Sequence, residues 1–138
     1  MWAFQLVPSI ARIYSRPHYP FHTPNTVVAN YSAAMHAKYE VLQMAISSNP
    51  FNTRYFCWLD IGLFRDLSGA GVNAPRFALS LPPKFDTDSV AYTEVLRRVP
   101  NVSVEDIVSK NMFWVCGCFF VGRIDVLQLL IKDYKVGP

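Results

Sequence analysis

The chain has 138 residues, near the size of one ordinary domain, and its 51% apolar content excludes intrinsic disorder because such a chain can bury a core. Charged residues make up only 17%, against about 25% in an average globular domain, so we expect a partner to cover part of an apolar surface. The net charge of +3 is scattered, with no like-charged run longer than Arg97-Arg98, which does not support a nucleic-acid partner.

Residues 1–23 are expected to form an extended, proline-rich approach segment. Four prolines lie in the first 24 residues, and proline removes an amide donor and fixes φ. Thr23-Pro24 then has the pattern of an N-cap followed by proline at the first helical position, which predicts a helix start. This helix is expected to end at residues 47–50 and to bury its regularly spaced apolar residues, which are Met35, Tyr39, Leu42 and Ile46.

Residues 55–59 form a continuous apolar run that does not alternate with polar residues. A strand buried on both faces of a parallel sheet has this pattern. Asp60 follows directly, at the carboxyl end of the expected strand, where open α/β sheets bind ligands. Its carboxylate is placed to meet a hard cation or a sugar hydroxyl, and Asp66 could share that site. Equally, Asp60 could cap the turn or pair with Arg54 or Arg65.

The rest of the chain predicts two more strands and two more helices. Residues 77–81 read as a strand, residues 89–98 as a short helix, and residues 103–106 as the opening of another turn. A third strand is expected over residues 112–120, ended by Gly122. A final helix should follow, because apolar residues recur at helical spacing at Ile124, Leu127, Ile131 and Tyr134. Strands separated by helices indicate an α/β layered domain.

The apolar stretches are too short for a membrane span. The longest, residues 112–121, is about half of the roughly 20 residues that a helix needs to cross a bilayer. We therefore expect no transmembrane segment.

The cysteines are Cys57, Cys116 and Cys118, each in an apolar run, where cysteine usually behaves as a small buried hydrophobe. We expect all three to be reduced and mostly buried. Cys116 and Cys118 are expected to point to opposite faces of a strand, which would make a bond between them geometrically awkward. Their spacing is not the two-residue gap of a zinc or thioredoxin motif, so metal binding by them is not expected.

Catalytic motifs are sparse. His36 and Glu40 form a single helical i, i+4 pair, for which a catalytic histidine is one interpretation and a polar helix face the other. The sequence contains no Ser-His-Asp signature, no phosphate-binding glycine loop and no His-Glu-x-x-His motif. Hydrolase and NTPase functions therefore have no motif support.

Several segments together resemble the HtrL/YibB family. They are residues 23–26, 36–40, 49–51, 55–62 and 117–122. The most specific piece is Trp58-Leu59-Asp60-Ile61-Gly62, placed soon after Asn49-Pro50-Phe51. The likeness covers roughly residues 20–125, and the chain looks like the central part of a longer domain.

This resemblance implies a glycosyltransferase-like protein with a GT-A fold, an α/β three-layer Rossmann-like architecture with a mainly parallel central sheet. Residues 1–138 would form one partial domain of that kind. The implied reaction transfers a sugar from a nucleotide-sugar donor to a glycan acceptor, with Asp60 as the catalytic residue and as a ligand of Mn²⁺ or Mg²⁺. The matching motifs imply substrate contacts by Trp58, Gly62, Gly117, Phe119, Gly122, His36 and Lys38. The alternative is a catalytically inactive α/β module that binds carbohydrate or another protein.

Overall fold

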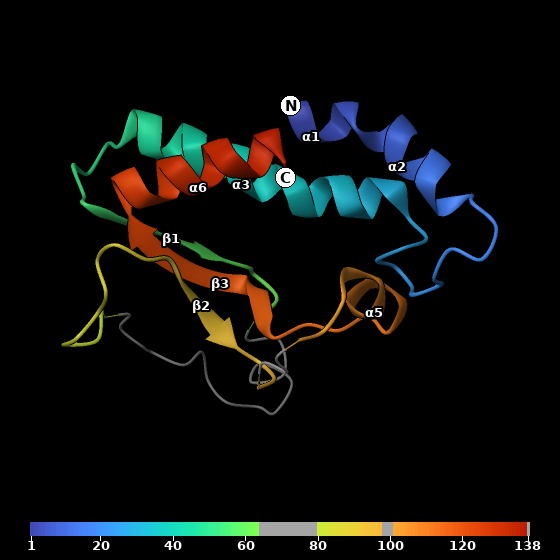
Figure 1. The fold of residues 1–138 in the computed structure, drawn as a ribbon. Coiled ribbons are helices and arrows are strands. Elements are labelled where there is room, and N and C mark those ends of the chain that lie inside the picture. Colours follow the sequence, from blue (N-terminus) through green and yellow to red (C-terminus); the bar gives the residue numbers. More distant parts are fainter. Residues whose placement is uncertain (64–79, 98–100, 138) are drawn as a thin grey trace, which may run out of the picture. The chain divides into compact units, whose positions relative to one another are not determined.

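The computed structural model describes residues 1–63, 80–97 and 101–137. Its helices and strands are, in chain order, α1 (Trp2–Gln5), α2 (Val7–Tyr14), α3 (Ala29–Ser48), β1 (Tyr55–Leu59), β2 (Ala91–Glu94), α5 (Val104–Ser109), β3 (Val115–Arg123) and α6 (Ile124–Val136) (Figure 1). The chain divides into two compact units. The first unit comprises Met1–Phe51 and Glu94–Val115, and the second comprises Asn52–Thr93 and Cys116–Pro138.

In the first unit, α1 and α2 pack on α3. The small side chains of Ala33 and Ala37 are buried on α3, as is Ala3 on α1, and small residues let helix backbones approach closely. Leu42 and Ile46 are buried as expected, whereas Met35 is 37% exposed. The prediction of which residues of α3 are buried was therefore partly wrong. Where helices pack closely, the small alanines of α3 are buried and the larger Met35 is partly exposed.

Residues 2–14 form helices α1 and α2, so the expectation of an extended segment is wrong there. Pro8 lies in the first turn of α2, where a backbone N–H has no intrahelical partner and its loss costs nothing. The predicted end of α3 is confirmed at Ser48, but the helix begins at Ala29 and not at Pro24. The Thr26 hydroxyl instead holds a turn, accepting from His22 N at 2.7 Å and donating to Pro20 O at 2.6 Å.

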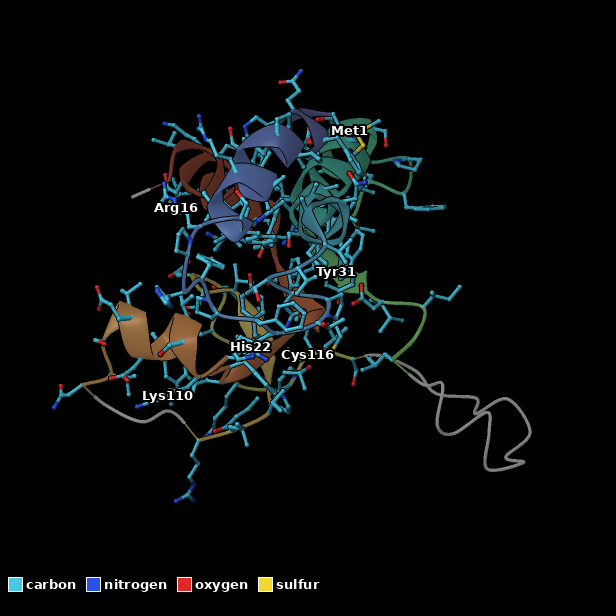
Figure 2. The ribbon with its side chains drawn as sticks, turned by 90° about the vertical axis from the view of Figure 1, so that its right-hand side faces the viewer. Met1, Arg16, His22, Tyr31, Lys110 and Cys116 are labelled. Carbon is cyan, nitrogen blue, oxygen red and sulfur yellow. A yellow bond between two sulfur atoms is a disulfide. The ribbon has the colours of Figure 1, made fainter. Side chains whose placement is uncertain are left out.

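The predicted turn at residues 103–106 is confirmed as the start of α5. Ser103 is the N-cap, and its hydroxyl accepts a hydrogen bond from Asp106 N at 3.0 Å. At the other end of α5, the His22 imidazole Nε2 donates to Ser109 O at 3.0 Å. His22 and the neighbouring Lys110 of this helix end are labelled in Figure 2. This contact ties the loop before α3 to α5 within the first unit.

The second unit contains most of a three-stranded sheet with the order β1-β3-β2. β1 and β3 are antiparallel, in a register that pairs Tyr55 with Arg123. β2 also runs opposite to β3, because Val90 lies beside Gly122 while the Tyr92 ring lies against that of Phe120, with centroids 5.0 Å apart and planes tilted by 31°. The expected α/β, three-layer, GT-A or Rossmann-like fold with a mainly parallel sheet is therefore wrong.

The side chains of this sheet alternate between two apolar faces. The helix face carries Phe56, Trp58 and Phe120 and lies against α6, whose Leu127 is fully buried (Figure 1). The opposite side, which we call the pocket face, carries Cys57 and Val121. Because both faces of β1 need apolar residues, its sequence does not alternate, and this was mistaken for the signature of a parallel strand.

The remaining elements are partly as expected. β1 is confirmed over Tyr55–Leu59, and the third strand and final helix are confirmed as β3 and α6, although β3 begins and ends about three residues later than expected. The predicted helix over residues 89–98 is wrong, because β2 occupies residues 91–94. The predicted strand at residues 77–81 falls mainly outside the described residues.

Cys116 and Cys118 form a disulfide, and Cys57 is an exposed thiol. The expectation of three reduced and mostly buried cysteines is therefore wrong. It treated Cys116 and Cys118 as lying on opposite faces of a strand, which holds for adjacent residues, whereas residues two apart share a face. Their Cα atoms are 5.1 Å apart, well within reach of a disulfide.

Candidate functional site

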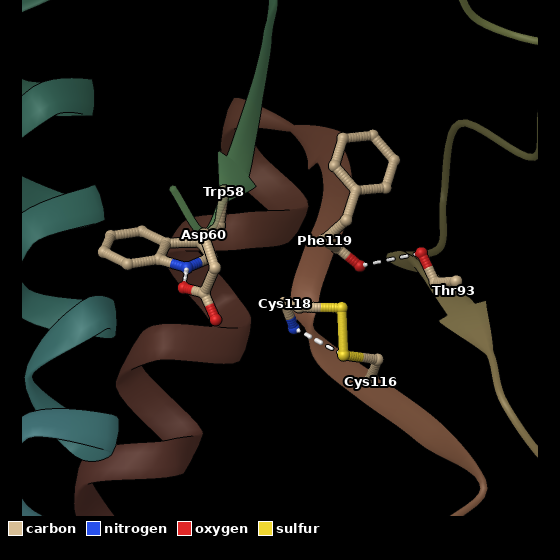
Figure 3. Close-up of a disulfide and its surroundings, with 6 residues drawn as sticks. All are labelled: Trp58, Asp60, Thr93, Cys116, Cys118 and Phe119. Carbon is tan, nitrogen blue, oxygen red and sulfur yellow. Dashed lines mark hydrogen bonds between the residues drawn. A yellow bond between two sulfur atoms is a disulfide. The ribbon is translucent and has the colours of Figure 1, made fainter. Parts of the chain in front are cut away.

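Asp60 follows β1 and is anchored by its backbone and its side chain. Its N–H donates to Cys118 O on β3 at 2.8 Å, and its carbonyl accepts from Leu63 N at 3.0 Å. The Trp58 indole Nε1 donates to Asp60 Oδ1 at 2.5 Å (Figure 3). A half-buried carboxylate is therefore held in one orientation at the end of the strand.

The expected site residues of the second unit do not all meet at Asp60. Trp58 contacts it directly, Gly62 lies in the turn that follows it, and Gly117 precedes the Cys118 carbonyl that binds it. Phe119 lines the pocket face, on the other side of the sheet from Trp58.

Gly122 is a packing position within β3 and does not end the strand, which continues to Arg123. It pairs with Phe56 at the end of β1 remote from Asp60. A Cβ added there would lie 3.0 Å from Leu127 Cγ on α6. The glycine is therefore explained by the close approach of helix and sheet.

The described residues do not fit a site for Mn²⁺ or Mg²⁺ at Asp60. These hard cations take several oxygen ligands. Within residues 1–63, 80–97 and 101–137, no three His, Cys, Asp or Glu side chains gather closely enough to hold an ion. The Trp58 N–H also competes with a cation for one carboxylate oxygen. Arg65 and Asp66, which the sequence offered as partners of Asp60, lie outside the described residues.

His36 and Lys38 lie on α3 in the first unit. Lys38 is buried, and His36 is half-buried, with its pKa lowered from 6.5 because burial disfavours the charged imidazolium. Glu40, the other member of the i, i+4 pair, accepts hydrogen bonds from Trp2 N and Ala3 N at 2.9 and 3.0 Å. Glu40 is thus occupied in holding α1, which favours a structural interpretation of the pair.

Sequence reasoning missed a pocket of about 360 Å³ on the pocket face of the sheet. Its aromatic lining includes Tyr55, Phe85 and Phe119, and the hydroxyl residues Ser80 and Thr93 also border it. The Tyr55 and Phe85 rings meet edge to face at 5.9 Å. One pattern in the sequence could have indicated this pocket. Larger and smaller side chains alternate along Val90-Ala91-Tyr92-Thr93, as in a strand, and the smaller residues Ala91 and Thr93 lie on the pocket face.

Comparison with known families supports the resemblance in the sequence. Residues 17–133 match the model of a family described as "Bacterial protein of unknown function (HtrL_YibB)". No curated protein and no solved structure matches the chain. Over the part of the chain that the structure describes, no helix has the length and apolar character needed to cross a membrane. Because the family model covers α3, the strands β1, β2 and β3 and most of α6, the chain belongs to the HtrL_YibB family.

Proposed function

We propose that this chain binds carbohydrate through the pocket on the pocket face of its sheet. The observation that carries this proposal is the combination of aromatic rings and hydroxyl groups around one pocket. An aromatic ring offers a flat apolar surface to the C–H face of a sugar ring, while hydroxyls can bond to those of the sugar. Mostly apolar pockets with a few polar groups, of about 300–1,000 Å³, are typical of small-molecule sites.

The pocket is built on a rigid base. Tyr55 and Phe119 come from the paired strands β1 and β3, and Thr93 comes from β2 on the other side of β3. Thr93 Oγ1 donates to Phe119 O at 3.5 Å, a long hydrogen bond that links the two strands at the pocket. Phe85 stands in the loop before β2 and is supported by its contact with Tyr55. Strand-borne groups of this kind are preorganised for a ligand.

Saturation-transfer NMR with a panel of monosaccharides and short glycans would test sugar binding. Phe85→Ala is expected to weaken binding about tenfold, equivalent to about 1.4 kcal/mol, because it removes one aromatic wall. Phe113→Ala is the matched control, since Phe113 is a half-exposed phenylalanine that does not line the pocket. The proposal fails if none of the sugars binds, or if the two variants weaken binding equally.

A second candidate function is sugar transfer from a nucleotide-sugar donor, with Asp60 as the acting carboxylate. The observation that favours it is the Trp58 hydrogen bond, which fixes the Asp60 side chain at a strand end. Asp60 would accept the proton of an acceptor hydroxyl while the hydroxyl oxygen attacks the anomeric carbon and the bond to the leaving diphosphate breaks. Carbohydrate binding is the better supported proposal. The pocket lies on the other side of the sheet from Asp60, so a sugar bound there would not meet the Asp60 carboxylate.

Calorimetry with nucleotide sugars would test the second candidate. Asp60→Asn is expected to abolish binding of the donor while changing the melting temperature little. Asp133→Asn, a change at an exposed acid on α6, is the control and is expected to leave binding intact. If Asp60→Asn still binds the donor as tightly as the parent chain, Asp60 is structural and the transfer function loses its central residue.

A further inference from the structure

The disulfide of β3 joins two cysteines separated by one residue. Both cysteines are half-buried, so neither residue is fully enclosed in a core. The disulfide adjoins the end of β1, because Cys118 O accepts the Asp60 N–H. Asp60 and both cysteines are drawn in Figure 3. Neither cysteine is among the residues that line the pocket.

Chain stabilisation explains such a bond poorly. In the chain-entropy account, a disulfide stabilises a protein by restricting the unfolded chain, and the effect grows with the length of the loop that it closes. Cys116 and Cys118 close a loop with a sequence separation of 2, close to the shortest that exists. The backbone around Gly117 is already held by β3, so the bond restrains little that the sheet does not.

The two sulfur atoms have different surroundings. The Cys118 backbone N–H donates to Cys116 Sγ at 3.1 Å (Figure 3). Within the described residues, no hydrogen bond to Cys118 Sγ is present. A donor aimed at a sulfur atom stabilises the negative charge that appears there when the S–S bond opens. Cys116 is therefore the better leaving thiolate, and Cys118 is the sulfur that a nucleophile should attack.

We propose that Cys116 and Cys118 form a redox-active disulfide that is reduced by a dithiol, with Cys116 as the leaving thiolate. One thiolate of the dithiol attacks Cys118 Sγ, the S–S bond breaks, and its electron pair leaves on Cys116 Sγ. The second thiol of the reductant loses its proton and attacks the reductant sulfur of the mixed disulfide, releasing the Cys118 thiolate. The dithiol is oxidised to a disulfide, and the cysteine pair gains two electrons and two protons.

Alkylation of the folded full-length chain, read by intact mass, tests whether the pair is redox-active. Before reduction, iodoacetamide is expected to add once, at the exposed Cys57. After dithiothreitol treatment without denaturant, three additions are expected, and oxidised dithiothreitol should return the count to one. Three additions before reduction, or one addition after it, would overturn the proposal.

The assignment of the leaving thiolate is tested with two matched variants. Cys57→Ser with Cys118→Ser leaves Cys116, and Cys57→Ser with Cys116→Ser leaves Cys118, while the backbone N–H of residue 118 is kept in both. The N–H of residue 118 stabilises the Cys116 thiolate, and the lower nucleophilicity of a stabilised thiolate offsets part of this gain, so Cys116 should alkylate about threefold faster near neutral pH. Equal rates would overturn the assignment.

A measurement on the unmutated chain covers the case in which a variant fails to fold. Brief exposure to glutathione, followed by acid quenching and peptide mapping, is expected to find the glutathione adduct on Cys118. An adduct mainly on Cys116 would show that Cys118 is the leaving thiolate and would contradict the proposal.

Discussion

The carboxylate of Glu40, in the middle of α3, accepts a hydrogen bond from the backbone N–H of Ala3, 37 residues earlier in the chain, at 3.0 Å. Its other oxygen accepts from the N–H of Trp2 at 2.9 Å. These N–H groups belong to the first turn of α1 and have no partner within that helix. A side chain distant in sequence thus caps a helix that is only four residues long.

Replacing Glu40 with Gln should loosen α1. The amide keeps one acceptor oxygen but loses the charge and the second acceptor, so we expect a loss of about 1–2 kcal/mol in the free energy of unfolding. Urea unfolding followed by circular dichroism measures it. Glu105→Gln, at an exposed acid in the first turn of α5, should change stability by only a few tenths of a kcal/mol. Equal effects of the two changes would contradict the capping role.

Gly122→Ala should destabilise the packing of α6 on the sheet. The new Cβ would lie 3.0 Å from Leu127 Cγ and 3.3 Å from Val90 Cγ2, so Leu127 must shift to make room. We expect a cost of about 1–3 kcal/mol, as in other overpacked cores. In a double-mutant cycle, the same change in a Leu127→Ala background should cost less, because the crowding atoms are gone. If the costs of Gly122→Ala and Leu127→Ala simply add, the Leu127 side chain is not the source of the crowding.

Asp106 should titrate below its usual range. The hydrogen bond from the Lys110 ammonium, whose Nζ lies 2.6 Å from Asp106 Oδ1, lowers the pKa of this carboxyl. A carboxyl with a lowered pKa stabilises the fold above its unfolded pKa, and that contribution disappears as the pH falls through the folded pKa. NMR titration should find a midpoint below 3.8, and Lys110→Gln should raise it. An unchanged midpoint would show that the ion pair is absent in solution.

His36 should make the fold less stable in mild acid. Burial lowers its pKa, so the unfolded chain binds a proton at pH values where the folded chain does not. The contribution of neutral His36 to the free energy of unfolding is therefore fully present above the ordinary pKa of 6.5. It is lost as the pH falls through the lowered pKa of the folded chain. Urea midpoints at about pH 7.5 and about pH 5.5 should differ less in His36→Gln than in the parent chain. The same difference in both proteins would refute this role.

The sequence predicted strands and helices best where their patterns are local. The apolar run Tyr55–Leu59 and the helical spacing of Leu127 and Ile131 are direct consequences of burial, and both elements were found at or near their expected bounds. Strand direction is different, because it depends on which segments pair. A run that is apolar on both faces fits a parallel strand between helices, and it fits equally an antiparallel strand with α6 on one face and a pocket on the other.

The candidate site was predicted only in part, because some of its features are local in the sequence and others depend on which distant segments come together. The Asp60 position at a strand end follows from its place in the sequence, and Trp58, two residues earlier, shares its face of the sheet. The pocket depends on residues from three segments, such as Tyr55, Phe85 and Thr93, and no local pattern joins them. The proline count likewise misled the interpretation of the N-terminus, because Pro8 is harmless in the first turn of α2.

The boundaries of the two compact units bear on how this protein can be dissected. The chain passes from one unit to the other three times, after Phe51, after Thr93 and after Val115. Two of these crossings lie inside strands, near the end of β2 and at the start of β3. Each unit is built from two separate segments of the chain. A fragment that ends or begins at one crossing therefore lacks a segment of at least one unit or carries a segment of the other. Ligand binding and thiol chemistry should therefore be assigned by point substitutions in the full-length chain, since an expressed fragment would lack part of the sheet or of the helical unit.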